Sequence, residues 1–273
     1  MIHAISTLNL PHRKDVRWSL LAFLLLYVGY AMLAPSFPRT FIQFLASLLT
    51  CFFLDILWLR LKKVPIFPLS GIISSLGVFL LCDSPTIWAY VLVAALTIAS
   101  KHLFTTNRQH IFNPNNFALV IAVLYFEESI TIVSGNWGGN LLLAGLIAIF
   151  GAYVSYRAER WSLVLSYALG FLLLGVFRSM LSKLPLTIIW GPATGAAFQL
   201  FIFYMITDPK TTPNNKKQQI FFGTTMAFID AGLRMAQNKY APFIALFTIS
   251  SLQPAIQYFI TQWGKKAPMV SRN

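Results

Sequence analysis

Two short polar segments interrupt an otherwise apolar chain, and both combine side-chain amides or a carboxylate with proline. Residues 113–116 read Asn-Pro-Asn-Asn, and residues 207–213 read Thr-Asp-Pro-Lys-Thr-Thr-Pro. Asn or Asp before proline favours a turn, and proline readily takes the first position of a helix. Helix capping alone explains either segment. Two such segments on one face raise the case for a site where helix N-termini bind a polar group.

The sequence carries none of the patterns of a self-contained enzyme. It has no Ser/His/Asp order, no P-loop and no GxGxxG. The cysteines, Cys51 and Cys82, lie far apart with no CxxC, so we expect no metal site of the zinc or iron–sulfur kind. His102 and His110 flank a loop and do not face each other deep within two helices, so we expect no haem.

The composition indicates an all-α polytopic membrane protein. Apolar residues make up 57% of the 273 residues, charged residues only 11%, and the mean hydropathy is +0.67. A soluble domain has about 25% charged residues. The net charge of +13 lies in short loops between apolar runs, which favours a role in topology over nucleic-acid binding. We expect one membrane domain spanning 1–273.

Ten apolar runs are candidates for membrane spans, each of which needs roughly 20 residues unless it is broken or shielded by protein. The third and fifth are short, which is typical of the spans that form binding sites in transporters. The ten runs are 18–34, 40–59, 69–82, 86–100, 116–127, 140–156, 161–177, 186–206, 219–233 and 241–260.

The Lys and Arg residues set the expected orientation. If both termini are cytoplasmic, 16 of the 21 fall on the inner side. This asymmetry is a positive-inside signal. The five on the outer side are Arg39, Arg178, Lys183, Arg234 and Lys239.

Two apolar stretches resemble each other. Ser70 begins one and lies 13 positions before Asp83; Thr194 begins the other and lies 14 positions before Asp208. Each hydroxyl residue is followed by glycine, and each Asp lies close to a proline. With five spans in each half, the second copy is inverted across the membrane. We therefore predict inverted five-helix repeats over about 18–128 and 140–260, joined by the turn-rich residues 134–140.

Some single residues are also candidates. Asp55 is a carboxylate deep in an apolar run, which is either functional or snorkels to the basic residues at 60–63. Asp230 and Arg234 have the spacing of an i,i+4 ion pair. The aromatic residues at 201–204 could stack on a flat ring, although helix packing explains each of them as well.

A family resemblance rests on several of these motifs. The chain reads KHLF at 101–104, FNPNNFA at 112–118, and ITDPKTTP at 206–213 followed by a basic loop and IFFG. Over residues 69–258 it resembles the NqrB/RnfD family, membrane proteins of the sodium-translocating NADH:quinone oxidoreductase and of the Rnf complex. It is more similar still to short UnbU-like members. The resemblance implies two inverted five-helix repeats in the bacterial cytoplasmic membrane, bound flavin, and electron transfer with partner subunits.

The sequence departs from the family at the flavin attachment point. Larger relatives attach flavin mononucleotide to a Thr in a (D/S)GAT motif, whereas residues 195–198 read Gly-Ala-Ala-Phe, and Phe198 has no hydroxyl. We therefore expect riboflavin or FMN bound without a covalent bond. The expected binding residues are Ser70, Asn113, Asn115, Thr194, Phe203, Thr207, Asp208 and Thr211.

Two other functions remain open. The same cavity between repeats would serve a permease or channel for a small neutral or flavin-like solute. A scaffold protein within a larger membrane complex is the third possibility.

Overall fold

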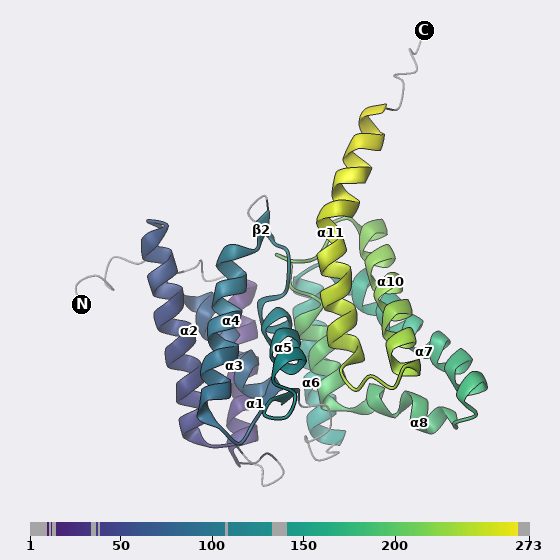
Figure 1. Ribbon diagram of the computed structural model, residues 1–273, viewed down its shortest axis with the longest axis horizontal. Helices are drawn as coiled ribbons and strands as arrows, with labels where there is room; N and C mark the ends of the chain where they lie inside the picture. Colours follow the sequence, from purple (N-terminus) through teal and green to yellow (C-terminus); the bar gives the residue numbers. More distant parts are fainter. Residues whose placement is uncertain are drawn as a thin grey trace.

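The computed structural model describes residues 10, 12, 15–33, 37, 39–106, 109–132 and 141–266, with side chains up to residue 255 except those of 141, 142 and 196. The described chain is mostly helical, with two short antiparallel strand pairs (Figure 1). Helix is present in all ten predicted apolar ranges, which confirms the all-α class. The predicted joint at 134–140 lies outside the described residues.

The first five helices form one side of the molecule in Figure 1, drawn in purple to teal. Local sequence explains their ends. Thr40 forms a capping box with Gln43, and the side chain of Asn113 caps the helix that begins with Pro114. Strands β1 (Cys82–Asp83) and β4 (Thr131–Ile132) pair beyond the third and fifth helices. The five helices are α1 (Val16–Leu33), α2 (Phe41–Leu61), α3 (Leu69–Leu81), α4 (Ile87–Leu103) and α5 (Pro114–Tyr125).

The second half contains the one broken segment among the ten. Where a single span over 186–206 was predicted, the structure has α8 (Leu186–Trp190), the 3-10 turn η2 (Gly191–Thr194), α9 (Ala196–Leu200) and the π-helical turn η3 (Phe201–Met205). The two arms of this segment are bent by 60°. The break lies at Gly195, whose backbone is extended (φ −79°, ψ 142°), while Pro192 takes an early position of the 3-10 turn before it. The remaining helices are α6 (Leu141–Arg157), α7 (Trp161–Ser182), α10 (Lys216–Met235) and α11 (Ala241–Lys266).

Glycine allows the closest helix pair to form. A Cβ on Gly223 of α10 would lie 2.2 Å from Ser166 Oγ of α7, and one on Gly170 would lie 2.6 Å from the Cβ of Ala227. The backbones of α7 and α10 therefore approach closely along much of their length. On the other side of the molecule, α4 packs on both α2 and α5.

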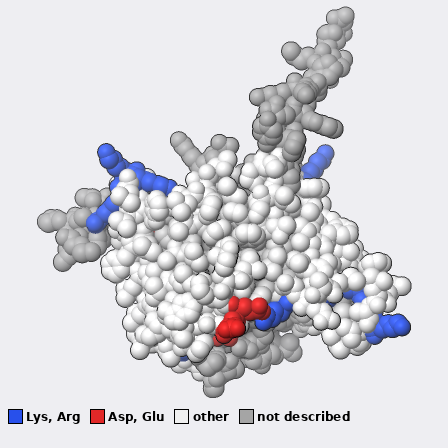
Figure 2. Space-filling view, viewed as in Figure 1, with Lys and Arg blue, Asp and Glu red and all other residues white. Residues whose placement is uncertain are grey.

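Length and apolar composition allow three described helices, α1, α2 and α7, to cross a membrane. A fourth crossing follows if the bent segment is one span. Large apolar side chains cover much of the outside, such as Leu173 at 71% and Ile149 at 66% exposed. Figure 2 shows a largely uncharged band between the Lys and Arg residues at the upper end and the charged residues below it. This surface suits lipid on the sides and water at the ends. The remaining short strands, β2 (Thr105–Thr106) and β3 (Gln109–His110), form a hairpin at the upper end.

Candidate functional site

A cavity of about 390 Å³ lies where the two halves of the molecule meet. Its walls come from α1, α3, α6, the start of α5, the π-helical turn η3 and the loop that follows it. Apolar side chains, among them Leu20, Leu24, Leu80 and Leu200, line part of it. Polar side chains from the two Asn/Asp-Pro motifs line the rest. A cavity of this volume is within the range of small-molecule sites.

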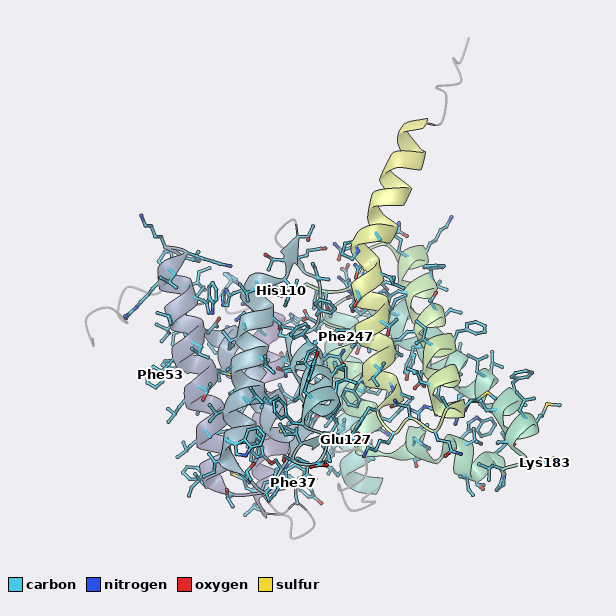
Figure 3. The ribbon with its side chains drawn as sticks, in the orientation of Figure 1. Phe37, Phe53, His110, Glu127, Lys183 and Phe247 are labelled. Carbon is cyan, nitrogen blue, oxygen red and sulfur yellow. The ribbon has the colours of Figure 1, made fainter. Side chains whose placement is uncertain are left out.

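Direct hydrogen bonds join the two motifs, although they are almost a hundred residues apart. Asn113 Nδ2 donates to the carbonyl of Met205 over 3.3 Å, while Asn113 Oδ1 accepts from the backbone N–H of Asn116. The backbone N–H of His110 donates to the carbonyl of Lys210 over 3.0 Å. His110 lies at the upper end of the helix bundle in Figure 3. The start of α5 and the end of η3 therefore form one rigid unit at the cavity.

Asp208 organises its own loop. Its Oδ1 accepts from the backbone N–H of Lys210 at 3.0 Å, and its carbonyl accepts from the hydroxyls of Thr211 and Thr212. Burial raises the pKa of the Asp208 carboxyl, and this effect is opposed by the bond from Lys210 and by nearby cations. Thr207 donates from Oγ1 to the carbonyl of Phe203 over 2.6 Å. The loop is thus fixed from within, with part of the carboxylate accessible from the cavity.

Arg160 fixes the same loop from outside, which sequence reasoning missed. This buried guanidinium donates to Thr212 Oγ1 over 2.9 Å and also to the carbonyl of Pro209 and the amide oxygen of Asn214. Gln219 adds bonds to the carbonyls on either side of the contact. The sequence marks Arg160 only as one of the Lys and Arg residues on the predicted inner side. Its hydrogen-bond partners lie about 50 residues further along the chain, so local spacing gave no sign of them.

Two buried acceptors at the cavity wall have no hydrogen-bond partner in the described structure: Asn115 Oδ1 and His110 Nδ1. Burial and the nearby Lys210 and Lys101 lower the pKa of His110 to about 4, so its ring is neutral at pH 7. An unpaired buried acceptor costs about 1–3 kcal/mol. Asn115 packs so closely on α3 that a Cβ on Gly77 would lie 1.9 Å from its Nδ2.

The cavity brings together five of the eight predicted binding residues and leaves three outside. Thr194 is exposed at the break of the bent segment and donates to the carbonyl of Gly191. Phe203 stacks on Trp161, with ring centroids 6.4 Å apart. Thr211 is buried but bonds only its own loop. These three residues do not line the cavity. The five that line the cavity are Ser70, Asn113, Asn115, Thr207 and Asp208.

Only one aromatic ring of the predicted cluster at 201–204 lies at the cavity. Tyr204 lines it, and its hydroxyl lies 2.7 Å from the hydroxyl of Tyr27 on α1. Phe201 instead packs against Phe243 in the core. The Tyr27–Tyr204 pair, which joins α1 to η3, gave no signal in the sequence.

The other charged candidates are paired. Asp230 and Arg234 form the predicted ion pair, with Nε 2.9 Å from Oδ1. Asp55 does not snorkel to the basic residues at 60–63: it is 1% exposed and binds Lys101 and His102. Among the described residues, no group of three or more His, Cys, Asp or Glu side chains could hold a metal ion.

The fold and site define a helical protein with helices able to span a membrane and a small-molecule cavity between its two halves. Comparison with models of known protein families gives no match, and comparison with curated proteins gives none either. The resemblance to the NqrB/RnfD family therefore stays a prediction.

Proposed function

We propose that this chain is an integral membrane subunit that binds a flavin non-covalently in the cavity and takes part in electron transfer with partner subunits. The observation that carries the proposal is the convergence of both Asn/Asp-Pro motifs on a single cavity. The bonds from Asn113 to Met205 and from His110 to Lys210 hold the motifs in fixed register.

The lining residues fit a flavin ring. Such a ring is apolar on its faces and carries alternating donors and acceptors along one edge. Asn113, Asn115 and Ser70 supply amide and hydroxyl groups for that edge, and the leucines of α1 and α3 supply apolar walls. Bound flavin would supply reversible uptake of electrons. The chain's own residues orient the ring and exclude water from it.

The position of Thr194 supports non-covalent binding. Its hydroxyl is exposed, away from the cavity, and bonds to its own turn. Phe198, in the place of the family's attachment residue, is buried and packs on Phe171. The polar end of the cavity holds two carboxylates and two cations, Asp15 with Arg17 and Asp208 with Lys210. This balance suits a neutral ligand such as riboflavin.

The inverted repeat belongs to the same proposal. The helix α3 begins at the cavity with Ser70, whereas the bent segment ends there with Thr207 and Asp208. Opposite senses of the two similar stretches would agree with the inverted repeats that we propose. We place the protein in the bacterial cytoplasmic membrane, with the polar end of the cavity on the cytoplasmic side.

A permease is the second candidate, favoured by the bent segment. Discontinuous helices line the solute sites of many transporters. Here the π-helical turn η3 supplies Tyr204 and Met205 to the cavity wall. The hydroxyl pair of Tyr27 and Tyr204 would then be a contact that opens as solute passes.

Absorbance of the detergent-purified protein tests the proposal. We expect a flavin spectrum that is lost on denaturation and filtration, bleached by dithionite and restored by a quinone. A colourless protein that does not bind added riboflavin would overturn it. Uptake of riboflavin into proteoliposomes without a reductant would favour the permease instead.

A further inference from the structure

The polar end of the cavity carries an ion pair at the start of α1. Asp15, the residue before this helix, accepts from the guanidinium of Arg17: Nε lies 3.1 Å from both carboxylate oxygens, and Nη2 lies 2.7 Å from Oδ2. Asp15 Oδ1 also accepts from the backbone N–H of Arg17 over 2.9 Å. Both residues line the cavity, with side chains 23% and 32% exposed. One carboxylate therefore takes all these bonds from a single cationic residue at the cavity wall.

The donors that Asp15 occupies are of the kind that binds phosphate. An arginine guanidinium donates parallel bonds to carboxylate or phosphate. The first backbone N–H groups of a helix have no partner within the helix, and the helix dipole favours negative charge there. Helix α1 has 18 residues and begins at Val16, so its N-terminus lies beside the same carboxylate. Asp15 thus fills the position that an anionic ligand would otherwise take.

The surroundings keep this carboxylate ionised. The bond from the Arg17 side chain lowers the pKa of Asp15, burial opposes this effect, and the nearby Lys210 lowers the pKa further. Lys210 in turn donates its backbone N–H to Asp208 Oδ1. Each of the two cations that line this end of the cavity is therefore matched by an acid of the same chain.

We propose that Asp15 is a specificity-determining residue, which excludes ligands that carry a phosphate group from the polar end of the cavity. The leucine-lined part takes an apolar ring, so the polar tail of the ligand lies beside Asp15 and Arg17. A tail of hydroxyl groups can donate to the carboxylate, whereas a terminal phosphate is repelled by it. Among flavins the cavity therefore selects riboflavin over FMN. This selection rests on the proposed function, whereas the filled anion position does not.

Inorganic phosphate tests the anion position without a flavin. Asp15→Asn keeps a side chain that can cap α1, but it removes the negative charge and releases the guanidinium of Arg17 from its ion pair. Near saturation, phosphate should raise the unfolding temperature of Asp15→Asn in detergent by about 2–4 °C more than that of the wild type. Sodium chloride at the same ionic strength is the control for screening. Equal shifts in the two proteins would overturn the proposal.

A double variant tests whether Arg17 supplies the donors. Asp15→Asn combined with Arg17→Gln should lose the additional shift, because the guanidinium is gone. Asp83→Asn is the matched control: its carboxylate lies 3.9 Å from Arg39, away from the residues that line the cavity. Phosphate should act on this control as it acts on the wild type. An additional shift that persists in the double variant would also overturn the proposal.

Flavin titration tests the selectivity. The wild type should bind riboflavin about 10- to 100-fold more tightly than FMN, because the phosphate meets a carboxylate in place of unoccupied donors. In Asp15→Asn, tighter binding of FMN should bring the ratio close to one. Equal affinities in the wild type, or an unchanged ratio in Asp15→Asn, would overturn the selectivity. If neither flavin binds the wild type, the proposed function fails, while the phosphate result still decides the anion position.

Discussion

Two similar stretches of this chain fold differently. The first, from Ser70 to Asp83, is one unbroken helix that ends in a short strand. The second ends at Asp208 and belongs to a segment of two short helices, a 3-10 turn and a π-helical turn. The backbone at the glycine after each hydroxyl residue marks the difference. Gly71 lies within α3, whereas Gly195 is extended, with ψ 142°, between the two arms of the second segment.

The two stretches contribute different parts of their length to the cavity, because the first lines it from Ser70 to Leu81 and the second only from Leu200 onward. Ser70, at the start of the first, lines it, while Asp83 lies at the far end of α3, 3.9 Å from Arg39. In the second, Thr194 is exposed away from the cavity, and Asp208 lies at its wall. Similar sequence patterns therefore mark different positions relative to the cavity in the two halves.

Asp208→Asn should have the largest effect on function. A hydrogen bond to a charged group contributes about 1.5–3 kcal/mol, so riboflavin affinity should fall about 10- to 100-fold. Equilibrium fluorescence titration measures the change. Asp83→Asn is the matched control from the first stretch and should leave the affinity unchanged. Equal losses in the two variants would show that the stretches do not differ in this way.

Gly77→Ala should destabilise the unbroken helix. The added Cβ would lie 1.9 Å from Asn115 Nδ2, and such overpacking costs about 1–3 kcal/mol. In the broken segment, a Cβ added at Gly191 would have no atom within 4 Å, and the backbone there is helical. Gly191→Ala should therefore leave the stability unchanged or raise it by about 0.4–1 kcal/mol. Thermal unfolding in detergent measures both. The contrast would be refuted if Gly191→Ala were the more damaging change.

Arg160→Lys should loosen the loop at the end of the second segment. Lysine cannot reproduce the several directed bonds of the guanidinium, and we expect a loss of about 1–2 kcal/mol together with weaker riboflavin binding. Arg39→Lys is the counterpart at the end of the first, where the guanidinium donates to the carbonyl of Phe79. It should leave riboflavin binding intact. Weakened riboflavin binding in Arg39→Lys would show that the ends of the two stretches do not differ in their effect on the cavity.

Tyr204→Phe should have the smallest effect. It removes one hydroxyl pair between η3 and α1, worth about 0.5–1.5 kcal/mol. Tyr27→Phe removes the same bond from the other side. The double variant should therefore lose less than the sum of the single changes in unfolding free energy. Additive losses would mean that the two hydroxyls do not depend on each other.

Hydropathy was enough to predict where the helices lie, because proline, asparagine or charged residues separate the apolar runs. It did not predict the break in the eighth run, although Gly191, Pro192 and Gly195 were the signal for it. The motif residues Asn113, Asn115 and Asp208, which line the cavity, could be singled out because they interrupt apolar sequence. Thr194 and Phe203 were misplaced because the bend and the π-helical turn change the direction in which side chains point.

Tertiary contacts account for what the sequence could not reveal. Arg160 meets its loop only when α7 and α10 pack together, and the Tyr27–Tyr204 pair likewise forms only when α1 packs on η3. The partners of Asp55 are 46 and 47 residues away. Local spacing had offered the basic residues at 60–63 as partners of Asp55, because they are nearest in sequence. In the structure its partners are Lys101 and His102 instead.

The π-helical turn at Phe201–Met205 has a consequence for how this chain could change over generations. Such a turn closes its hydrogen bonds over five residues instead of four, so it holds an additional residue. Each residue of an α-helix rotates the next by about 100°. Because the wider turn absorbs this residue, deleting one residue here would restore regular winding and leave Thr207 and Asp208 facing the cavity. The same deletion in the regular α-helical part of the segment would turn both side chains away by about 100°, so the turn is the place where this segment can lose a residue and keep the direction of its motif.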